Sequence, residues 1–167
     1  SRPLKPPIFG LGLSNVWFMR HPDDARDLVE QIERQGLKKA VLVGAGYIGL
    51  EVAEGLLERG LEVTVVERLD APMGAVLDAD MAAGVADAMR AAGIDLKLGT
   101  AVTGFTTVDG RVTSVATASG PIAADLVVIG LGVRANVDLA RAAGIGVGEA
   151  GGIIVDDHLR TDTPHVW

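Results

Sequence analysis

The stretch Lys38–Glu67, KKAVLVGAGYIGLEVAEGLLERGLEVTVVE, decides the fold of this chain. A short apolar run leads into the turn GAGYIG, a helical pattern of apolar residues follows, and a second apolar run stops at an acid. This order predicts a strand, a glycine turn, a helix, a second strand and a carboxylate at the end of that strand. A G-x-G-x-x-G turn in this context is typical of a βαβ unit that binds a dinucleotide.

Each glycine of the turn has a separate physical task. Gly44 permits the tight turn, Gly46 lets a pyrophosphate approach the backbone, and Gly49 lets the helix lie close to the sheet. The first helical turn adds unpaired N–H groups and the positive end of the helix dipole, which favour a diphosphate. Glu67 lies 21 positions after Gly46, near the spacing at which a carboxylate binds the adenosine ribose hydroxyls. The alternative is a βαβ unit whose glycines serve packing alone.

The composition indicates one globular domain. The chain has 167 residues, of which 49% are hydrophobic and 22% charged, enough to build a core. The net charge of -7 without a basic cluster disfavours nucleic-acid binding, which needs clustered Lys and Arg. No apolar run approaches the length of a membrane span, and no secretory signal opens the chain. We therefore expect a cytoplasmic protein without a membrane partner.

The residue types of many catalytic and metal sites are missing. The chain has no cysteine, which excludes disulfides, thiolate zinc sites and a cysteine nucleophile within it. His21, His158 and His165 are scattered along the sequence. Because metal ligands cluster at short spacings, we expect no metal site.

The segments around the glycine turn predict an α/β domain. We expect the helix after the turn to end at Gly60 with a left-handed cap. The resulting βαβαβ order implies a parallel sheet, helices over its faces and right-handed crossovers. The other expected elements are an edge strand at 16–19, helices at 22–35 and 78–92, a loop at 68–77 and a third strand at 94–98.

The pattern of apolar residues changes in the second half of the chain. Short apolar runs broken at Asp109-Gly110 and at 119–121 predict an antiparallel meander. The fully apolar run 126–129 predicts a strand buried on both faces, and a second glycine turn, GLGVRAN, follows it. Because loops at the carboxyl ends of parallel strands form the ligand crevice, we expect both glycine turns to face one ligand. Further along, the pattern predicts a short helix at 136–143 and a strand at 153–155.

The chain resembles the central NAD-binding domain of the FAD-dependent pyridine nucleotide-disulfide oxidoreductases, nearest to coenzyme A-disulfide reductases, NADH oxidases and NADH peroxidases. The resemblance rests on VLVGAGYIGLEVAEGL, VVER, DLVVIGLGVRAN and GGIIVDDHLRTDTPHVW. It implies a three-layer, Rossmann-like FAD/NAD(P)-binding fold whose parallel sheet has an antiparallel β-meander crossover. It divides the chain into a connector at 1–15, an NAD(H)-binding domain at 16–136 and a segment at 137–167 that returns toward an FAD domain.

The resemblance also implies roles for single residues. The glycine turn would cradle the NADH pyrophosphate, and Glu67 would bind the adenosine ribose. Glu51 matches an acid that holds the nicotinamide carboxamide, although it could be a solvated helix carboxylate. Tyr47 matches an aromatic residue that covers the flavin and swings aside for nicotinamide, although it could pack at the turn. The implied cofactor-binding residues are Gly44, Ala45, Gly46, Tyr47, Ile48, Gly49, Glu51, Glu67, Arg68 and Gly132.

Two departures from the family pattern concern the coenzyme site. Ala135 stands where many relatives have proline, which loosens the second glycine turn. Arg68 follows Glu67 directly, and an arginine there could bind the 2′-phosphate of NADPH. We expect NADH, because the Glu67 carboxylate would repel that phosphate, and NADP(H) stays the alternative.

A further departure concerns the flavin. In the family, FAD binds chiefly to an amino-terminal domain that also supplies the redox cysteine, and neither is present in this chain. We therefore expect a fragment of an oxidoreductase that is inactive alone, with the FAD and dimerisation domains of a parent chain as partners. Two other functions stay open: an NAD-sensing or adenosine-binding module without redox activity, and a methyltransferase. The second is disfavoured because S-adenosylmethionine has no phosphate for the three-glycine turn.

Overall fold

The computed structural model describes residues 1–5 and 12–167. They form two compact units, of which the larger comprises Lys5–Gly132. The smaller unit combines Ser1–Leu4 with Val133–Trp167. The predicted division placed boundaries after residues 15 and 136, and residues 6–11 of the predicted connector lie outside the described residues.

A five-stranded parallel sheet forms the centre of the larger unit. Its strand order is β2-β9-β3-β4-β5, and every neighbouring pair is parallel. β9 therefore lies inside the sheet, between β2 and β3, although it comes last in the sequence. The strands are β2 (Val16–Trp17), β3 (Lys39–Val43), β4 (Glu62–Val66), β5 (Asp95–Lys97) and β9 (Leu126–Ile129).

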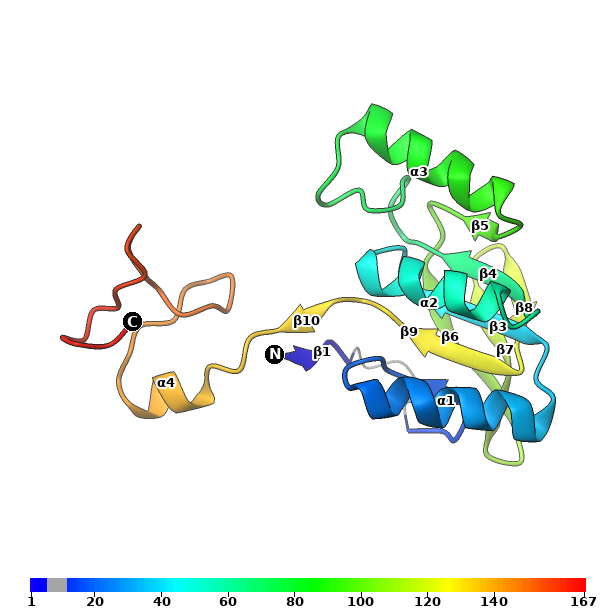
Figure 1. The fold of residues 1–167 in the computed structure, drawn as a ribbon, viewed down its shortest axis with the longest axis horizontal. Coiled ribbons are helices and arrows are strands. Elements are labelled where there is room, and N and C mark those ends of the chain that lie inside the picture. The colour runs from blue at the N-terminus through cyan, green and yellow to red at the C-terminus, as the bar shows by residue number, and fades with distance from the viewer. Residues whose placement is uncertain (6–11) are drawn as a thin grey trace. The chain divides into compact units, whose positions relative to one another are not determined.

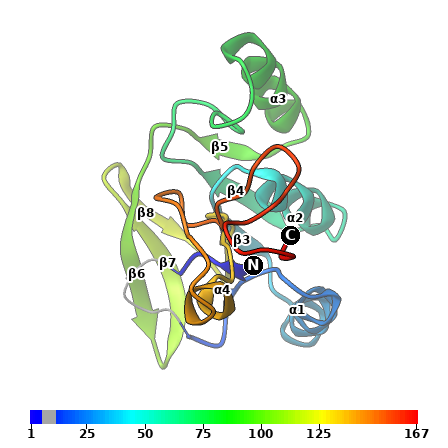
Figure 2. The same cartoon turned by 90° about the vertical axis from the view of Figure 1, so that its left-hand side faces the viewer.

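Helices cover one face of this sheet and a meander covers the other (Figures 1 and 2). The predicted three-layer α/β fold with a parallel sheet and a meander crossover is confirmed. The helices are α1 (Pro22–Gln35), α2 (Tyr47–Leu57) and α3 (Ala79–Ala91). The antiparallel meander consists of β6 (Val102–Val108), β7 (Arg111–Thr117) and β8 (Gly120–Ala123).

Side-chain alternation along the strands divides the core in two. Successive side chains of a strand point to opposite faces of the sheet. Leu42 of β3 therefore packs in the cluster under the helices, and its neighbour Val41 packs in the cluster under the meander. Val65 and Val66 of β4 divide in the same way. All four are at most 1% exposed, so β3 and β4 at the centre of the sheet are buried on both faces, as expected for parallel strands covered on both sides.

Most turns form where the sequence predicts them. Gly36 ends α1 with a φ of 61°, and Asp109 and Gly110 turn β6 into β7 with φ of 49° and 73°. The regular part of α2 ends at Leu57, three residues before Gly60. Gly60 is the left-handed cap that the sequence predicts: it has a φ of 75°, its N–H donates to the Leu57 carbonyl, and the Leu61 N–H donates to the Leu56 carbonyl.

The smaller unit has little regular structure. β1 (Arg2–Pro3) pairs antiparallel with β10 (Val133–Arg134), and α4 (Asp138–Ala142) forms within the predicted helix at 136–143. The predicted strand at 153–155 is wrong. Ile153 makes only an isolated bridge to Val147, and Ile153–Val155 are 41–57% exposed. An apolar run needs a neighbouring strand to complete its backbone hydrogen bonds, and among the described residues this run has none beyond that bridge.

Asn15 is a buried polar link that the sequence pattern does not reveal. Its side chain is 0% exposed. The amide nitrogen donates to the carbonyls of Val112 (2.8 Å) and Asp125 (2.9 Å), and the amide oxygen accepts the Val112 N–H at 2.9 Å. Its own carbonyl accepts the Val127 N–H at 2.9 Å. One residue thus joins the segment before β2 to the meander and to β9.

Replacing Asn15 by alanine is expected to destabilise the larger unit. The change leaves the buried N–H and carbonyl of Val112 and the part-buried carbonyl of Asp125 without their partner, which costs roughly 2–4 kcal/mol. Urea unfolding followed by circular dichroism measures this loss. Asn136→Ala is the matched control, because Asn136 is exposed and its replacement should cost less than about 0.5 kcal/mol. Equal unfolding midpoints for the two variants would contradict the structural role of Asn15.

The start of α1 depends on the charge of Asp24. His21 and Asp24 form a capping box, in which Asp24 accepts the N–H groups of His21 (2.7 Å) and Arg20 (2.8 Å). These hydrogen bonds, that from His21 first, lower the pKa of the Asp24 carboxyl from its ordinary value. A lowered pKa means that the folded chain favours the charged form, so this stabilisation is present above the ordinary pKa and is lost as the pH falls through the lowered value.

Asp24→Asn is expected to destabilise the fold in a pH-dependent way. At pH 7 the loss should be on the order of 1 kcal/mol, as for other helix caps. At pH 3, below the ordinary pKa of 3.8, the difference from the unchanged chain should shrink, because the stabilisation by the Asp24 charge is lost as the pH falls toward the lowered pKa. Chemical unfolding at both pH values tests this, with Glu30→Gln, an exposed acid on the same helix, as the control. An equal loss at both pH values would show that the charge is not responsible.

Candidate dinucleotide-binding site

Three glycines bring the ends of β3 and β9 against the start of α2. Gly44 has a φ of 104°, and a β-carbon there would lie 2.6 Å from the Gly130 carbonyl oxygen. A β-carbon at Gly49 would overlap the carbonyl oxygen of Gly44. Gly130 lies beside Gly49 in turn and donates its N–H to the Val43 carbonyl at 2.8 Å. The two predicted glycine turns therefore meet at one edge of the sheet.

Gly46 has the opposite surroundings. A β-carbon at Gly46 would meet no atom within 4 Å, so this glycine is not required by packing. It is the N-cap of α2 with extended backbone and makes no side-chain cap. The backbone at Gly46 thus stands open where the first N–H groups of α2 are unpaired, which is the arrangement that suits an anion.

Glu67 reaches back to the glycine turn from the end of β4. One carboxylate oxygen accepts the Ala45 N–H at 2.8 Å, and the other accepts the Leu69 N–H at 2.8 Å. Ala45 is 0% exposed, and Glu67 is half-buried. The acid and the glycine turn, separated in sequence, are therefore side by side at the carboxyl edge of the sheet.

The loop after β4 also holds the glycine turn, which sequence reasoning missed. Met73 donates its N–H to the Ala45 carbonyl at 2.9 Å, and its φ of 55° is left-handed. Pro72 beside it is fully buried. In the sequence, Pro72 indicates a loop, but it does not indicate which residues the loop contacts.

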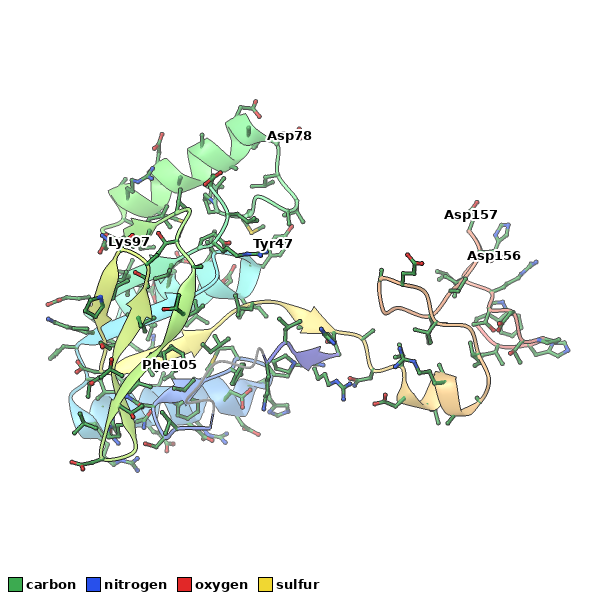
Figure 3. The ribbon with its side chains drawn as sticks, turned by 180° about the vertical axis from the view of Figure 1, so that it is seen from behind. Tyr47, Asp78, Lys97, Phe105, Asp156 and Asp157 are labelled. Carbon is green, nitrogen blue, oxygen red and sulfur yellow. The ribbon has the colours of Figure 1, made fainter. Side chains whose placement is uncertain are left out.

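The other residues predicted to bind the coenzyme lie in α2 or follow β4 and β9, and most of them are exposed. Tyr47, at the start of α2 (Figure 3), is 68% exposed, and Glu51 one turn later is exposed. Ile48 is half-buried. Arg68 is exposed, and within the described part of the chain it has no hydrogen bond or ion pair. Gly132 is exposed with a φ of 91° and is the last residue of the larger unit.

The described residues contain neither a metal-binding cluster nor a membrane-spanning helix. Nowhere in 1–5 and 12–167 do three or more His, Asp or Glu residues gather in a way that could hold a metal ion. Over the same residues, no helix has both the length and the apolar character needed to cross a bilayer. The cytoplasmic location stays a prediction.

Comparison with known proteins identifies the family. The family described as pyridine nucleotide-disulphide oxidoreductase matches residues 1–167. This chain belongs to that family. Rhodocoxin reductase of Rhodococcus erythropolis is 37% identical over 161 residues, which make up 96% of this chain and 37% of that protein. The chain thus spans little more than a third of this relative.

Solved structures of oxidoreductases share the fold. A NAD-dependent persulfide reductase from A. fulgidus matches with a TM-score of 0.90 and 38% identity, over 97% of this chain and 30% of that chain. A water-forming NADH oxidase from Lactobacillus brevis, bound to NADH, matches with a TM-score of 0.84 and 30% identity, over 95% of this chain and 34% of that chain. An engineered form of that oxidase, bound to NADPH, replaces an aspartate by alanine and the next residue, an alanine, by arginine.

Gly49→Ala is expected to destabilise the fold. Its β-carbon has no room beside the Gly44 carbonyl, and backbone displacement in a packed core costs roughly 1–3 kcal/mol or more. Gly84→Ala is the matched control, since Gly84 lies inside α3 with nothing within 4 Å of its β-carbon. That change should be neutral or stabilising by up to about 1 kcal/mol. Thermal unfolding compares them, and an unchanged midpoint for Gly49→Ala would refute the packing role.

Proposed function

We propose that the larger unit binds NADH at the carboxyl edge of its sheet, as part of a flavin-dependent oxidoreductase. One observation carries the proposal: the Glu67 carboxylate accepts the Ala45 N–H of the glycine turn. The acid that would bind the ribose therefore adjoins the turn that would bind the diphosphate. The solved NADH oxidase, which is bound to NADH and shares this fold, supports the same coenzyme.

Each part of the dinucleotide has a fitting group in this proposal. The pyrophosphate lies against the open backbone at Gly46 and the unpaired N–H groups that begin α2. The ribose hydroxyls of the adenosine donate to Glu67, whose oxygens each accept one backbone N–H and keep a further lone pair. Gly132, which presents exposed backbone after the second glycine turn, faces the ribose of the nicotinamide.

Tyr47 and Glu51 have the exposure that a redox role requires. A bound nicotinamide supplies a hydride to a flavin, and the protein supplies position and electrostatics. Tyr47 is 68% exposed and can move aside for the nicotinamide, whose carboxamide Glu51 then holds. The segment 137–167 leads toward the FAD-binding part of the protein. The relatives are named as reductases and oxidases, which favours this role over an NAD-sensing module.

The proposed coenzyme is NADH rather than NADPH. The charged carboxylate of Glu67 stands where the 2′-phosphate would lie, and two negative groups in contact repel each other strongly at a partly buried site. The Arg68 guanidinium would instead favour NADPH, because it can bind the 2′-phosphate. The NADPH-bound engineered oxidase carries five substitutions, among them an aspartate replaced by alanine and the next residue, an alanine, replaced by arginine.

Isothermal titration with NADH tests the proposal. For residues 1–167 titrated by themselves without FAD, we expect a dissociation constant in the micromolar range or weaker, on the order of -8 kcal/mol at best, because in that experiment no flavin faces Tyr47 and Glu51. NADPH should bind more weakly, and S-adenosylmethionine should not bind. Gly46→Ala should weaken NADH about tenfold or more by placing a methyl group against the pyrophosphate, whereas Gly84→Ala should leave it unchanged. Failure of NADH to bind at millimolar concentration would refute the function, and nanomolar binding would refute the expected affinity.

A further inference from the structure

Met73 has a backbone conformation that its residue type disfavours. Its φ of 55° is left-handed, a region that residues other than glycine, asparagine and aspartate enter rarely and at a cost in free energy. In the described part of the larger unit, Asp109 is the other non-glycine residue with a positive φ, and a hairpin turn favours that conformation at an aspartate. Met73 lies instead in the loop between β4 and α3. A costly conformation persists only where its surroundings impose it, and it often marks a functional site.

The polar groups of the Met73 backbone bond in two different places. Its carbonyl accepts the N–H groups of Val76 at 2.9 Å and Leu77 at 3.1 Å, which closes a turn within the loop. Its N–H leaves the loop and donates to the Ala45 carbonyl at 2.9 Å. Pro72, which is fully buried, precedes it. The left-handed residue therefore both closes the loop and contacts the glycine turn.

The hydrogen bond from Met73 sets the direction of the Gly46 N–H. The Ala45 carbonyl and the Gly46 N–H belong to one trans peptide group, so they point in opposite directions. With the Ala45 oxygen bound to Met73, the Gly46 N–H points away from the loop. It has no hydrogen-bond partner in the described residues, and a β-carbon at Gly46 would meet no atom within 4 Å. This N–H is therefore available to a ligand at the start of α2.

Among the described residues, only Met73 bonds to the atoms of this peptide group. The Glu67 carboxylate accepts the Ala45 N–H, which belongs to the preceding peptide group, and the Leu50 N–H donates to the carbonyl of the following one. Because glycine rotates about its backbone bonds with little penalty, the group between them can turn over once the Met73 bond is absent. Ala45 is 0% exposed, so its carbonyl would then lack a partner in a buried position.

We infer that Met73 is a positioning residue, whose backbone N–H aims the Gly46 N–H at the diphosphate of a bound dinucleotide. The inference rests on the proposed function and extends it to the loop between β4 and α3. A diphosphate at the start of α2 accepts the Gly46 N–H in a charge-assisted hydrogen bond, which forms only when the peptide group has this direction. The Met73 side chain takes no part. Any residue that keeps the N–H and tolerates the left-handed conformation therefore serves equally well.

Calorimetric titration of NADH and of inorganic pyrophosphate into three variants tests the inference. Met73→Pro removes the N–H and cannot adopt a positive φ, and it should weaken both ligands about tenfold, the scale of one hydrogen bond to a charged group. Met73→Gly keeps the N–H and favours the left-handed conformation, so it should retain binding within about twofold. Ala79→Pro is the matched control, because it places proline at the first position of α3, where proline is favoured. Equal weakening by Met73→Pro and Met73→Gly would overturn the inference.

Met73→Val keeps the inference testable if Met73→Pro does not fold. Valine retains the N–H, but its branched side chain makes a positive φ more costly. The loop should then withdraw the N–H, and binding of both ligands should weaken several-fold. Valine also fills more of the space of methionine than glycine does, so a packing role would make Met73→Gly the weaker binder of the two. That order would contradict the inference.

Amide hydrogen exchange of the unchanged chain provides a test without a substitution. A hydrogen bond that favours ligand binding is itself favoured by the ligand to the same extent, so saturation with NADH should slow exchange of the Met73 N–H about tenfold. The Leu77 N–H, which bonds within the loop, should slow less and serves as the control. Unchanged exchange at Met73 would overturn the inference, and equal slowing at Leu77 would do so too, because it would indicate general ordering of the loop.

Pyrophosphate separates this inference from the proposed function. If NADH does not bind, but Met73→Pro weakens pyrophosphate and Met73→Gly does not, the proposed function fails and the positioning role stands. If NADH binds, and all variants at Met73 bind it as the unchanged chain does, the proposed function stands and the positioning role fails.

Discussion

The contact of three backbone segments at Gly44, Gly49 and Gly130 is the constraint on which the larger unit depends. No side chain fits between these segments, so the end of β3, the end of β9 and the start of α2 approach to backbone distance. This approach directs the first N–H groups of α2 toward the edge of the sheet. The position of these N–H groups is thus a product of close packing, and the proposed coenzyme site uses an arrangement that the packing already fixes.

Glu67 is held by backbone N–H groups of the segments that form the proposed coenzyme site. Because its carboxylate accepts N–H groups from the glycine turn and from the loop after β4, the side chain is held in one position in the absence of ligand. In the proposed complex with NADH, the ribose would not have to order the acid first, which reduces the loss of conformational freedom on binding. The same two hydrogen bonds make the residue costly to exchange, since a side chain without an acceptor, such as alanine, leaves the Ala45 N–H unpaired in a buried position.

Local patterns in the sequence were sufficient for much of the fold and for the candidate site. The glycine turn, the Asp109-Gly110 hairpin and the apolar run of β9 are each specified by adjacent residues. Contacts between distant residues could not be predicted in this way. Nothing in the local sequence shows that Asn15 bonds to Val112 or that Met73 bonds to Ala45. The pattern at 153–155 failed for the same reason, because a strand depends on a partner that local sequence does not reveal.

The position of β9 has a consequence for how the chain folds. β3 and β4 are joined by one helix and can pair soon after synthesis, whereas β9 is made after the whole meander and must then enter between β2 and β3. Until it does, the apolar edge of β3 lacks its neighbour. Pairing of residues so far apart in sequence is slow, and unpaired strand edges promote aggregation. A nascent chain whose β9 segment has not yet left the ribosome would therefore be the species that most requires a chaperone.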